Sequence, residues 1–390
     1  MEGVEVQRES LRLRTAAADV PLGFVRRDST VYLVARERSS QWPVDALREG
    51  SVTLTFRDGP RSGGIFLIAD PVEREAVLDQ FRSKYGPTLY ARWYEHPARV
   101  LRVDLAPAGE AVGRPPVYLD WLEAEFDNVA DDYDRHITGN RMNRLLRDRS
   151  LARLRPLFDG QRQLLEIGCG SGMETLKMLG EGHSVVAVDI SSRMLATVRE
   201  KAKREGLSER LSTEKLRAVE VDRLVGRYGE GAFDGGYSTY GALNCEPDLR
   251  PIPPALHRLL APGKKFLAGV YNRWCLAELV GYSFTLQFRR AFGRRSNPIP
   301  VGASRFCIDV FAYSAPEFAA LCRPYFSVER VEGVPVFLPP SDLTGYAEKF
   351  ARHFDTLARW DASLGRRWPL SALGDHFLMT LGRSDPAPAG

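Results

Sequence analysis

The chain reads LLEIGCGSGME from Leu164 to Glu174, a buried strand followed by a glycine-rich turn and the start of a helix. The glycines carry no Cβ, so a ligand can lie against the backbone at the N-terminus of that helix, where an anionic group such as a carboxylate is favoured. A dinucleotide fingerprint would need a glycine where Met173 stands, and a Walker loop would need G-K-[ST]. A pyrophosphate site is therefore disfavoured.

An acidic residue follows the next predicted strand. The stretch SVVAVD ends at Asp189, which lies seventeen positions after Gly172. A carboxylate at this place can accept hydrogen bonds from both hydroxyls of a ribose. The glycine turn and the acid together indicate a site for a nucleoside that carries an anionic group.

Strands and helices alternate on both sides of this pair. We expect strands at 164–167, 184–189, 216–221, 233–238, 265–271, 328–334 and 376–381, and helices at 119–133, 140–158, 315–321 and 341–364. Alternation of this kind predicts a parallel, doubly wound α/β sheet.

Residues 118–383 resemble the class I S-adenosylmethionine-dependent methyltransferases. The resemblance rests on the glycine turn, on Asp189, on FDGGYS at 233–238, on LLAPGKK at 259–265, which is similar to the family's "LxPGG" turn, and on ADDYD at 130–134, which is similar to its "A-x-x-YD" lid. It implies a Rossmann-like sheet of seven strands whose last strand is antiparallel, S-adenosyl-L-methionine as cofactor, and no metal.

The same resemblance implies a set of cofactor-binding residues. Gly168, Gly170 and Gly172, with Cys169 between them, would contact the methionine part, Asp189 the ribose, Ile190 and Met194 the adenine, Glu166 would orient the turn, and Tyr133 and Ser238 would complete the site. Residues 219–222 would frame the adenine edge through Glu220 and Val221, with Asp222 as an alternative to Glu220. Tyr133 equally fits a continuation of the apolar helix face from Val129.

Methyl transfer is an in-line displacement, in which positioning alone can supply roughly 7 to 11 kcal/mol. A general base is required where the acceptor is protonated. The candidates for catalytic roles are His136, Ser238, Tyr240 and Asn244, and then Glu246, Asn272 and Arg273. For His136 a surface role is favoured over catalysis, and His353 and His376 are expected to be structural.

The acceptor is expected to be a small molecule. The segment STYG at 238–241 is not the [DNS]-P-P-[YFW] signature of enzymes that methylate exocyclic or amide nitrogens. The stretch 274–311 exceeds what a class I core needs, and its apolar residues could cover a hydrophobic or aromatic acceptor. These residues are Tyr282, Phe284, Leu286, Phe288 and Phe292, and ordinary packing is the slightly favoured alternative.

The N-terminal part has a different pattern. Short strands at 31–35, 52–56, 64–68 and 100–105, with a helix from Asp70 to Gly86, resemble the split β-barrel of pyridoxamine-phosphate-oxidase-type and deazaflavin-dependent reductases. That family's phosphate loop is reduced to 23–28 here, so we expect a barrel used for dimerisation or substrate capture. With 106–116 as a linker, two domains are predicted, 1–110 and 111–390.

Composition limits the remaining possibilities. The 390 residues hold 54 Lys and Arg against 50 Asp and Glu, and this small excess does not indicate nucleic-acid binding. Five scattered cysteines form no C-x-x-C pair, so neither a disulfide framework nor a zinc cluster is indicated. No signal peptide or membrane span is recognisable, so we expect a cytoplasmic protein and, by analogy with other split barrels, a homodimer.

Two alternatives to a methyltransferase remain at this stage. One is a flavin- or deazaflavin-type oxidoreductase whose second domain merely binds S-adenosylmethionine. The other is a regulatory S-adenosylmethionine-binding protein without catalysis.

Overall fold

The computed structural model describes residues 10–16, 18–36, 40–68, 70–94, 99–107, 118–130, 133–299, 308–340 and 353–384. It divides into two compact units. Unit 1 comprises Met1–Glu125 with Phe306–Ile308, and unit 2 comprises Phe126–Arg305 with Asp309–Gly390. The division falls inside helix α3 (Tyr118–Val129), whereas most of the predicted linker lies outside the described residues.

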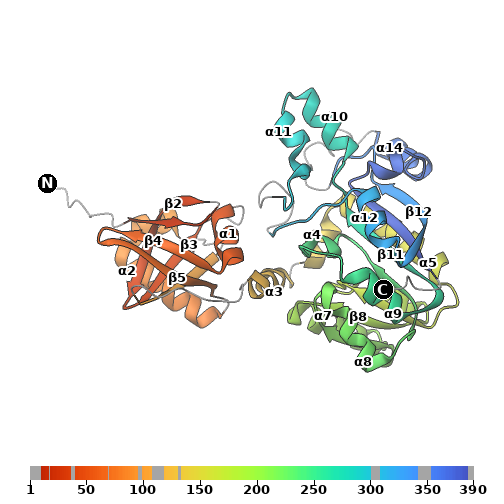
Figure 1. The fold of residues 1–390 in the computed structure, drawn as a ribbon, viewed down its shortest axis with the longest axis horizontal. Helices are drawn as coiled ribbons and strands as arrows, with labels where there is room; N and C mark the ends of the chain where they lie inside the picture. Colours follow the sequence, from red (N-terminus) through yellow and green to blue (C-terminus); the bar gives the residue numbers. More distant parts are fainter. Residues whose placement is uncertain are drawn as a thin grey trace. The chain divides into compact units, whose positions relative to one another are not determined.

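Unit 1 is a closed antiparallel barrel with the strand order β1-β2-β3-β6-β5-β4 (Figure 1). Its strands are β1 (Ser10–Arg14), β2 (Asp19–Arg27), β3 (Thr30–Ala35), β4 (Ser51–Phe56), β5 (Gly59–Leu67) and β6 (Arg99–Leu105). Inward-facing Val31, Leu33, Leu54 and Val103 are fully buried, as expected where β-branched and aliphatic residues alternate with polar ones. The barrel predicted from the resemblance is confirmed.

Two features of unit 1 differ from the sequence prediction. Residues 23–27, expected to be the remnant of a phosphate loop, belong to strand β2, and Phe24 pairs with Leu33 of β3. A helix not predicted as such, α1 (Gln41–Glu49), precedes β4. Pairing along β2 uses the backbone groups that a phosphate loop would present to a ligand, so residues 23–27 are part of a strand and not the remnant of such a loop.

Helix α2 (Pro71–Trp93) begins as predicted, with Asp70 accepting a hydrogen bond from the amide of Glu73 at 2.7 Å. Gly86, expected to end the helix, has φ 72° and ψ 165° and breaks it. A second helical stretch then starts at Pro87, because proline is well tolerated in a first helical turn.

Unit 2 is built on a seven-stranded sheet with the order β12-β13-β11-β10-β7-β8-β9 (Figure 1). The strands are β7 (Gln163–Ile167), β8 (Ser184–Asp189), β9 (Leu211–Lys215), β10 (Phe233–Ser238), β11 (Leu260–Tyr271), β12 (Phe326–Val334) and β13 (His376–Arg383). β13 runs antiparallel to both of its neighbours, and the other neighbouring pairs are parallel. The predicted Rossmann-like sheet with an antiparallel last strand is confirmed.

Helices cover both faces of this sheet. The described helices of unit 2 are α4 (Tyr133–Gly139), α5 (Arg141–Phe158), α6 (Met173–Gly180), α7 (Ser192–Arg204), α8 (Leu224–Tyr228), α9 (Ile252–Leu259), α10 (Leu276–Phe284), α11 (Phe288–Ala291), α12 (Ala315–Cys322) and α14 (Phe354–Leu364). Of these, α5, α6 and α7 pack on one face of the sheet and α8, α9 and α12 on the other. Successive residues of a strand serve opposite faces: Leu164 packs with α5 and α6, and Leu165 packs with α9 and α12. Continuous apolar strands are the consequence of this double covering.

The third strand of the sheet is not where the sequence placed it. Residues 216–221, predicted to be a strand, follow β9 and lead into a short 3₁₀ helix at Ala218–Arg223. Val221 is fully buried there in the core shared with α9, and Leu216 and Val219 pack against the same core. The apolar spacing of this segment reflects burial of one helical face, so the strand prediction was wrong.

Near the C-terminus, α14 covers the second half of the helix predicted at 341–364, and 341–352 lie outside the described residues. Asp361 on α14 is buried, and its carboxylate accepts hydrogen bonds from the amides of Val336, Phe337 and Leu338 at 2.5, 2.9 and 3.3 Å. One side chain thus holds the chain that leaves β12.

We predict that Asp361→Ala lowers the free energy of unfolding by about 3 kcal/mol, because buried amides lose their acceptor. Urea unfolding of the full chain, followed by circular dichroism, measures the change. Asp355→Ala is the matched control on the same helix: Asp355 is 89% exposed in an ion pair with Arg141, and its loss should cost below about 1 kcal/mol. Equal losses in the two variants would contradict the capping role.

Candidate cofactor and acceptor site

The glycine turn connects β7 to α6 at the carboxyl edge of the sheet. Gly168, Gly170 and Gly172 have φ of 73°, 52° and 79°, a region that other residues rarely adopt. A Cβ added to Gly168 would lie 2.1 Å from Cβ of Ala242, and one added to Gly172 would lie 2.8 Å from Val198. Both positions therefore require glycine for packing as well as for conformation.

Gly170 differs from the other two glycines. The nearest atom to an added Cβ would be Cε1 of Tyr133, at 3.7 Å. Tyr133 is the first residue of α4, so the predicted lid tyrosine does face the turn. Cys169 is buried, which raises the pKa of its thiol well above the usual value. A thiol that stays protonated is not a nucleophile, and this is consistent with a small residue tolerated in the turn.

Asp189 ends β8 beside the turn. One carboxylate oxygen accepts the amide of Gly170 at 2.8 Å, and the other accepts the amide of Ser191 at 2.9 Å. Burial raises the pKa of Asp189 to about 6. A carboxylate oxygen has more than one acceptor position, so Asp189 holds the turn in place and can still accept hydroxyl groups of a ligand.

Glu166 lies within β7 below the turn. Its carboxylate accepts hydrogen bonds from the hydroxyls of Thr175 on α6, at 2.5 Å, and Tyr237 on β10, at 3.1 Å. Burial raises its pKa to about 8. Glu166 thereby ties a strand, its neighbour and the following helix together beneath the turn.

Two carboxylates on the helices that precede the sheet bind the glycine turn and the residues that follow β8. Asp134, on α4, accepts a hydrogen bond from the Ser171 hydroxyl and pairs with Lys201, whose ammonium also donates to the Ser171 carbonyl at 2.8 Å. Asp127, on α3, accepts the hydroxyl of Ser191. In the sequence, Asp134 belongs to the predicted lid motif, and no motif indicates Asp127.

The residues predicted to contact adenine are dispersed. Met194 is buried in the first turn of α7, and Ile190 is partly buried between β8 and α7. Glu220 accepts the amide of Arg217 at 3.1 Å and pairs with Arg223, while the side chain of Val221 is in the core. Asp222 pairs with Arg258 on α9. The structure thus gives the side chains of residues 220–222 partners within the protein.

Several predicted catalytic residues lie at the end of β10 and in the chain that follows it, next to the glycine turn. The hydroxyl of Ser238 is fully buried and has no hydrogen-bond partner among the described residues. Tyr240 has φ 61°. The centroid of its ring lies 4.5 Å from the guanidinium carbon of Arg147 and 6.1 Å from the ring centroid of His376, with which it stacks.

The amide side chain of Asn244 is occupied by the backbone. It donates to the carbonyls of Tyr271 and Phe311 at 3.1 and 2.7 Å and accepts the amide of Tyr271 at 2.8 Å. Asn272, Arg273 and Glu246 likewise bind backbone carbonyls or ion-pair partners. His136 lies on α4, and its side chain is outside the described part of the structure.

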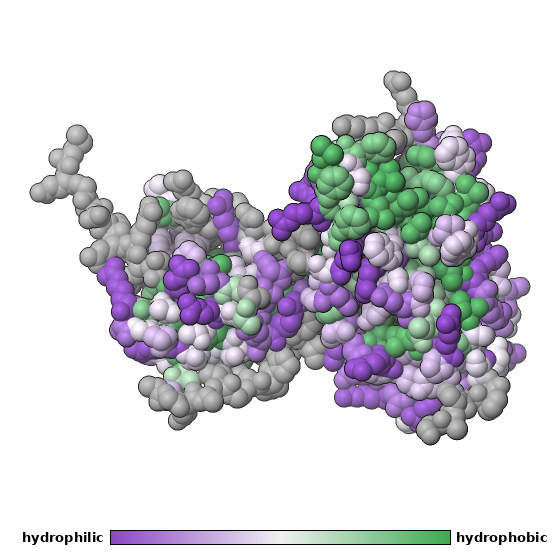
Figure 2. Space-filling model, turned by 45° about the horizontal axis from the view of Figure 1, so that its top comes forward, coloured by the Kyte–Doolittle hydropathy of each residue, from purple (hydrophilic) through white to green (hydrophobic). Residues whose placement is uncertain are grey.

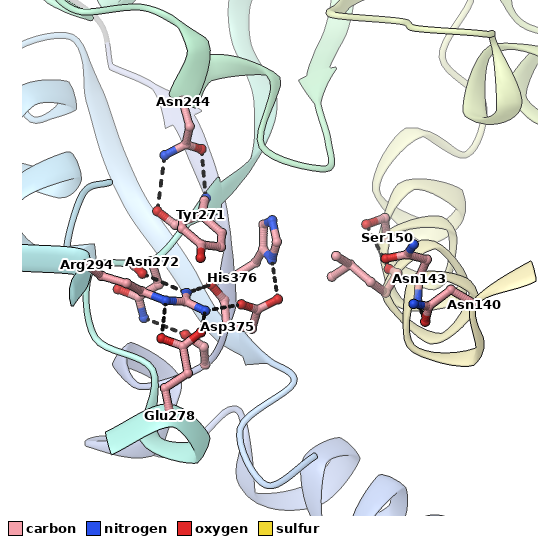
Figure 3. A network of polar contacts seen from close by, with 12 residues as sticks. Asn140, Asn143, Ser150, Asn244, Tyr271, Asn272, Glu278, Arg294, Asp375 and His376 are labelled. Carbon is pink, nitrogen blue, oxygen red and sulfur yellow. Dashed lines mark hydrogen bonds and ion pairs between the residues drawn. The ribbon is translucent and has the colours of Figure 1, made fainter. Parts of the chain in front are cut away.

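His376 comes to the same edge of the sheet and was expected to be structural. Its Nδ1 lies 3.1 Å from Oδ2 of Asp375 (Figure 3). Its Nε2 faces the turn after Tyr240, since a Cβ added to Gly241 would lie 3.4 Å from it. Tyr271 packs edge-on against the imidazole, with ring centroids 5.3 Å apart.

Asp375 is itself held by Arg294, whose Nη2 donates to it at 2.6 Å (Figure 3). The same guanidinium donates from Nε to Glu278 at 2.8 Å and from Nη1 to the carbonyls of Asn272 and Asp375, both at 3.0 Å. All three charged side chains are buried. Successive contacts from Glu278 to Arg294, to Asp375 and then to His376 fix the orientation of the His376 imidazole.

The described residues include one group with metal-ligand geometry, Cys275, Glu278 and Asp375, whose ligand atoms lie within 4.8 Å of one another. The guanidinium of Arg294 already binds both carboxylates there. Burial also raises the pKa of the Cys275 thiol, which opposes the thiolate that a metal needs. The cluster is better described as a buried ion-pair network.

Comparison with known proteins agrees with this geometry. Residues 164–263 match the family model described as a methyltransferase domain. The matched segment begins in β7 and ends within β11. This segment of the chain is therefore similar to methyltransferase domains. S-adenosylmethionine, the cofactor predicted from the sequence, is supported by this match.

Among curated relatives, the demethylmenaquinone methyltransferase of Bacteroides fragilis is 27% identical over 36% of this chain and 56% of its own length. The tRNA 5-carboxymethoxyuridine methyltransferase of Escherichia coli is 28% identical over 38% of this chain and 57% of its own length. Burkholderia thailandensis 1,6-didemethyltoxoflavin-N1-methyltransferase, solved with S-adenosylhomocysteine, has 20% identity and a TM-score of 0.43 over 72% of this chain and 95% of its own.

The chain spans little more than half the length of these two curated relatives. The matched 164–263 segment contains the glycine turn, Asp189 and Tyr240, whereas Asp375 and His376 lie beyond it.

We predict that affinity for S-adenosylmethionine falls as the pH drops through about 6, the pKa of buried Asp189. Protonation removes acceptor capacity for ribose hydroxyls, and the loss should approach about tenfold per pH unit below the pKa. Isothermal titration calorimetry between pH 8 and 5 measures it.

Asp189→Asn should bind weakly with a flatter pH profile. Asp248→Asn is the control, because the hydrogen bond from Arg250 lowers the pKa of this exposed carboxyl, which then does not titrate near 6. An unchanged affinity in Asp189→Asn would remove Asp189 from the site.

Proposed function

We propose that the protein transfers the methyl group of S-adenosylmethionine to a small-molecule acceptor with an aromatic or apolar body. One observation supports this above the others. The Asp375–His376 pair and the ring of Tyr240 lie at the carboxyl edge of the sheet, against the loop that packs on the glycine turn.

The residues at this edge fit the cofactor. Asp189 offers buried acceptor positions to a ribose, and Gly170 leaves the backbone uncovered toward Tyr133. The unpartnered hydroxyl of Ser238, fully buried at the end of β10, suits a polar group of the ligand. When bound, S-adenosylmethionine supplies a methyl group on a positively charged sulfur.

Aromatic rings form the acceptor side of the proposed site. Tyr240 stacks with His376, Tyr271 packs edge-on against it, and the guanidinium of Arg147 lies over the ring of Tyr240. Asn143, on α5 opposite His376 in Figure 3, has a buried side-chain oxygen without a partner among the described residues. Such a wall favours a flat acceptor held by stacking and by one or two polar contacts.

His376 is the base in this proposal. A histidine whose Nδ1 faces a carboxylate is fixed in the tautomer that accepts a proton at Nε2. The proton taken would be that of an acceptor hydroxyl or ring N–H as its heteroatom attacks the methyl group. Arg294 and Glu278 act through Asp375 and are positioning residues.

The flavin alternative has less support. Strand β2 stands where its phosphate loop was expected, and the backbone of Phe24 is bonded to the hydroxyl of Tyr85 at 2.9 and 3.1 Å. A small acceptor is also favoured over RNA, because the net charge of +4 gives no dominating basic field. Light scattering and cell fractionation test the homodimer and the cytoplasmic location expected from the sequence.

The experiment is transfer of labelled methyl from S-adenosylmethionine to a panel of 2-naphthol, 4-nitrophenol, 2-hydroxyquinoline and unfractionated tRNA. We expect product with one or more of the aromatic probes and none with tRNA. Labelling of tRNA alone would overturn the acceptor class. Binding of S-adenosylmethionine with transfer to no probe or cell extract would favour the regulatory alternative.

We predict that His376→Asn lowers kcat for neutral 2-naphthol by about 10² to 10³, the usual contribution of a general base. The loss should be much smaller for 4-nitrophenol at alkaline pH, where the acceptor is already ionised. S-adenosylmethionine affinity should not change. His353→Asn, on an exposed histidine before α14, is the control. Equal losses for both phenols would mean that His376 has only a structural role.

A further inference from the structure

Unit 2 exposes an unusual number of large apolar side chains. Eight such residues are exposed in the described part of the chain, and seven of them lie between 280 and 368. They are Val280, Phe284, Leu286, Phe288 and Phe292 in the α10–α11 segment, and Trp360 and Trp368 in and after α14. Phe284, Leu286 and Trp368 are 85%, 77% and 85% exposed. The interpretation of the α10–α11 aromatics as ordinary packing is therefore wrong for Phe284, Phe288 and Phe292.

These residues belong to elements at one end of unit 2. The amide of Leu276, at the start of α10, donates to the carbonyl of Leu373 at 2.9 Å, and Arg294, after α11, donates to the carbonyl of Asp375 at 3.0 Å. Both ends of the α10–α11 segment are thus tied to the chain that follows Trp368. Figure 1 places α10, α11 and α14 at the same end of unit 2, and Figure 2 shows a broad hydrophobic area there.

The charge of the α10–α11 part of this surface has a single sign. Residues 279–308 contain five arginines and no Asp, Glu or Lys. Arg289, Arg290 and Arg295 are exposed among the apolar side chains. Arg366, which pairs with Glu332, and Arg367 are exposed beside Trp368. The nearby acids Glu278, Asp361 and Asp375 are buried and already bonded. Asp355, on α14, is exposed and pairs with Arg141. In the described part of the α10–α11 segment, the exposed apolar groups are therefore accompanied by arginines and by no exposed acid.

A soluble protein rarely exposes contiguous apolar groups without a partner. Like charges oppose a second copy of the same surface, so the charge favours an anionic partner. Aromatic and aliphatic side chains mixed with arginines and bordered by tryptophan are the composition that binds the boundary between lipid headgroups and acyl chains. Phosphate headgroups can pair with the guanidinium groups while the apolar side chains enter the acyl layer.

We propose that the surface formed by α10, α11 and the α14–Trp368 region binds the face of an anionic lipid bilayer. In the described residues no helix is long and apolar enough to cross a membrane, so this contact is peripheral. It goes beyond the proposed methyl transfer and does not depend on it. The same segment is joined through Arg294 to Asp375, so the bound membrane would lie next to the acceptor side of the site.

The test is co-sedimentation of the full-length protein with vesicles, which needs no acceptor. Phosphatidylcholine vesicles with about 30 mol % phosphatidylglycerol should retain the protein, and pure phosphatidylcholine should retain much less. Sodium chloride at about 0.5 M should weaken the binding several-fold, because it screens the arginines. Tryptophan fluorescence should shift to shorter wavelength as Trp368 leaves water.

The double variant Phe284→Ser/Leu286→Ser should lower the partition coefficient about tenfold or more, since two large apolar side chains are lost. Arg289→Glu/Arg290→Glu should abolish the preference for anionic vesicles. Two controls match them: Val72→Ser removes the exposed apolar residue of unit 1, which is 78% exposed, and Lys203→Glu/Arg204→Glu reverses exposed charges on α7. Circular dichroism and S-adenosylmethionine affinity verify folding.

Three outcomes would overturn the proposal. The wild-type protein could fail to sediment with anionic vesicles at low salt. The surface variants could bind as tightly as the controls. Light scattering could show a dimer that the Phe284/Leu286 variant dissociates while no vesicle binding occurs, which would assign the surface to a second copy. Loss of methyl transfer with intact vesicle binding would affect only the proposed function.

Discussion

The hydrogen bond from the amide of Gly170 to the carboxylate of Asp189 is the interaction on which the site depends. It joins the ends of two neighbouring parallel strands, so it can form only when β7 and β8 are paired in their present register. Glu166 binds Thr175 on the helix after the turn, Asp134 binds Ser171 in the turn, and Asp127 binds Ser191 at the start of α7. The cofactor surface is thus assembled from residues far apart in the chain and held by buried carboxylates.

Burying acids in this way has an energetic cost, which appears as raised pKa values at Glu166 and Asp189. Backbone amides and hydroxyls offset part of it at these two residues, whereas Asp375 and Glu278 rely on Arg294. Removing one member of such a buried group leaves charge without compensation and typically costs about 3 to 5 kcal/mol. The same groups that shape the site therefore also make it intolerant of substitution.

The sequence predicted the central part of the fold because local signals and tertiary structure agree there. Gly168 to Gly172 and Asp189 lie directly at strand ends, and the apolar runs of β7 and β8 are buried on both faces. The third strand was misplaced because Leu216, Val219 and Val221 owe their burial to α9 and not to strand pairing. Periodicity alone does not distinguish these two causes.

His376 shows a different limit. Functional residues were sought after each strand, since parallel strands present their carboxyl ends at the site. β13 is antiparallel, so the residues that precede it reach the same edge. The rule that site residues follow a strand therefore does not reach Asp375 and His376, which lie before β13 and at its first residue. The exposed state of Phe284 and Leu286 depends on tertiary packing that composition does not encode.

The anchoring of the α10–α11 segment has a consequence for how this protein can diversify. Both ends of the segment are fixed to residues 373–375, one through the amide of Leu276 and the other through Arg294. Between them, residues 279–290 include no buried side chain. Insertions, deletions and exchanges within 279–290, which leave the buried Glu278 and Arg294 in place, can therefore accumulate at little cost to folding, so evolution or protein engineering can replace this stretch.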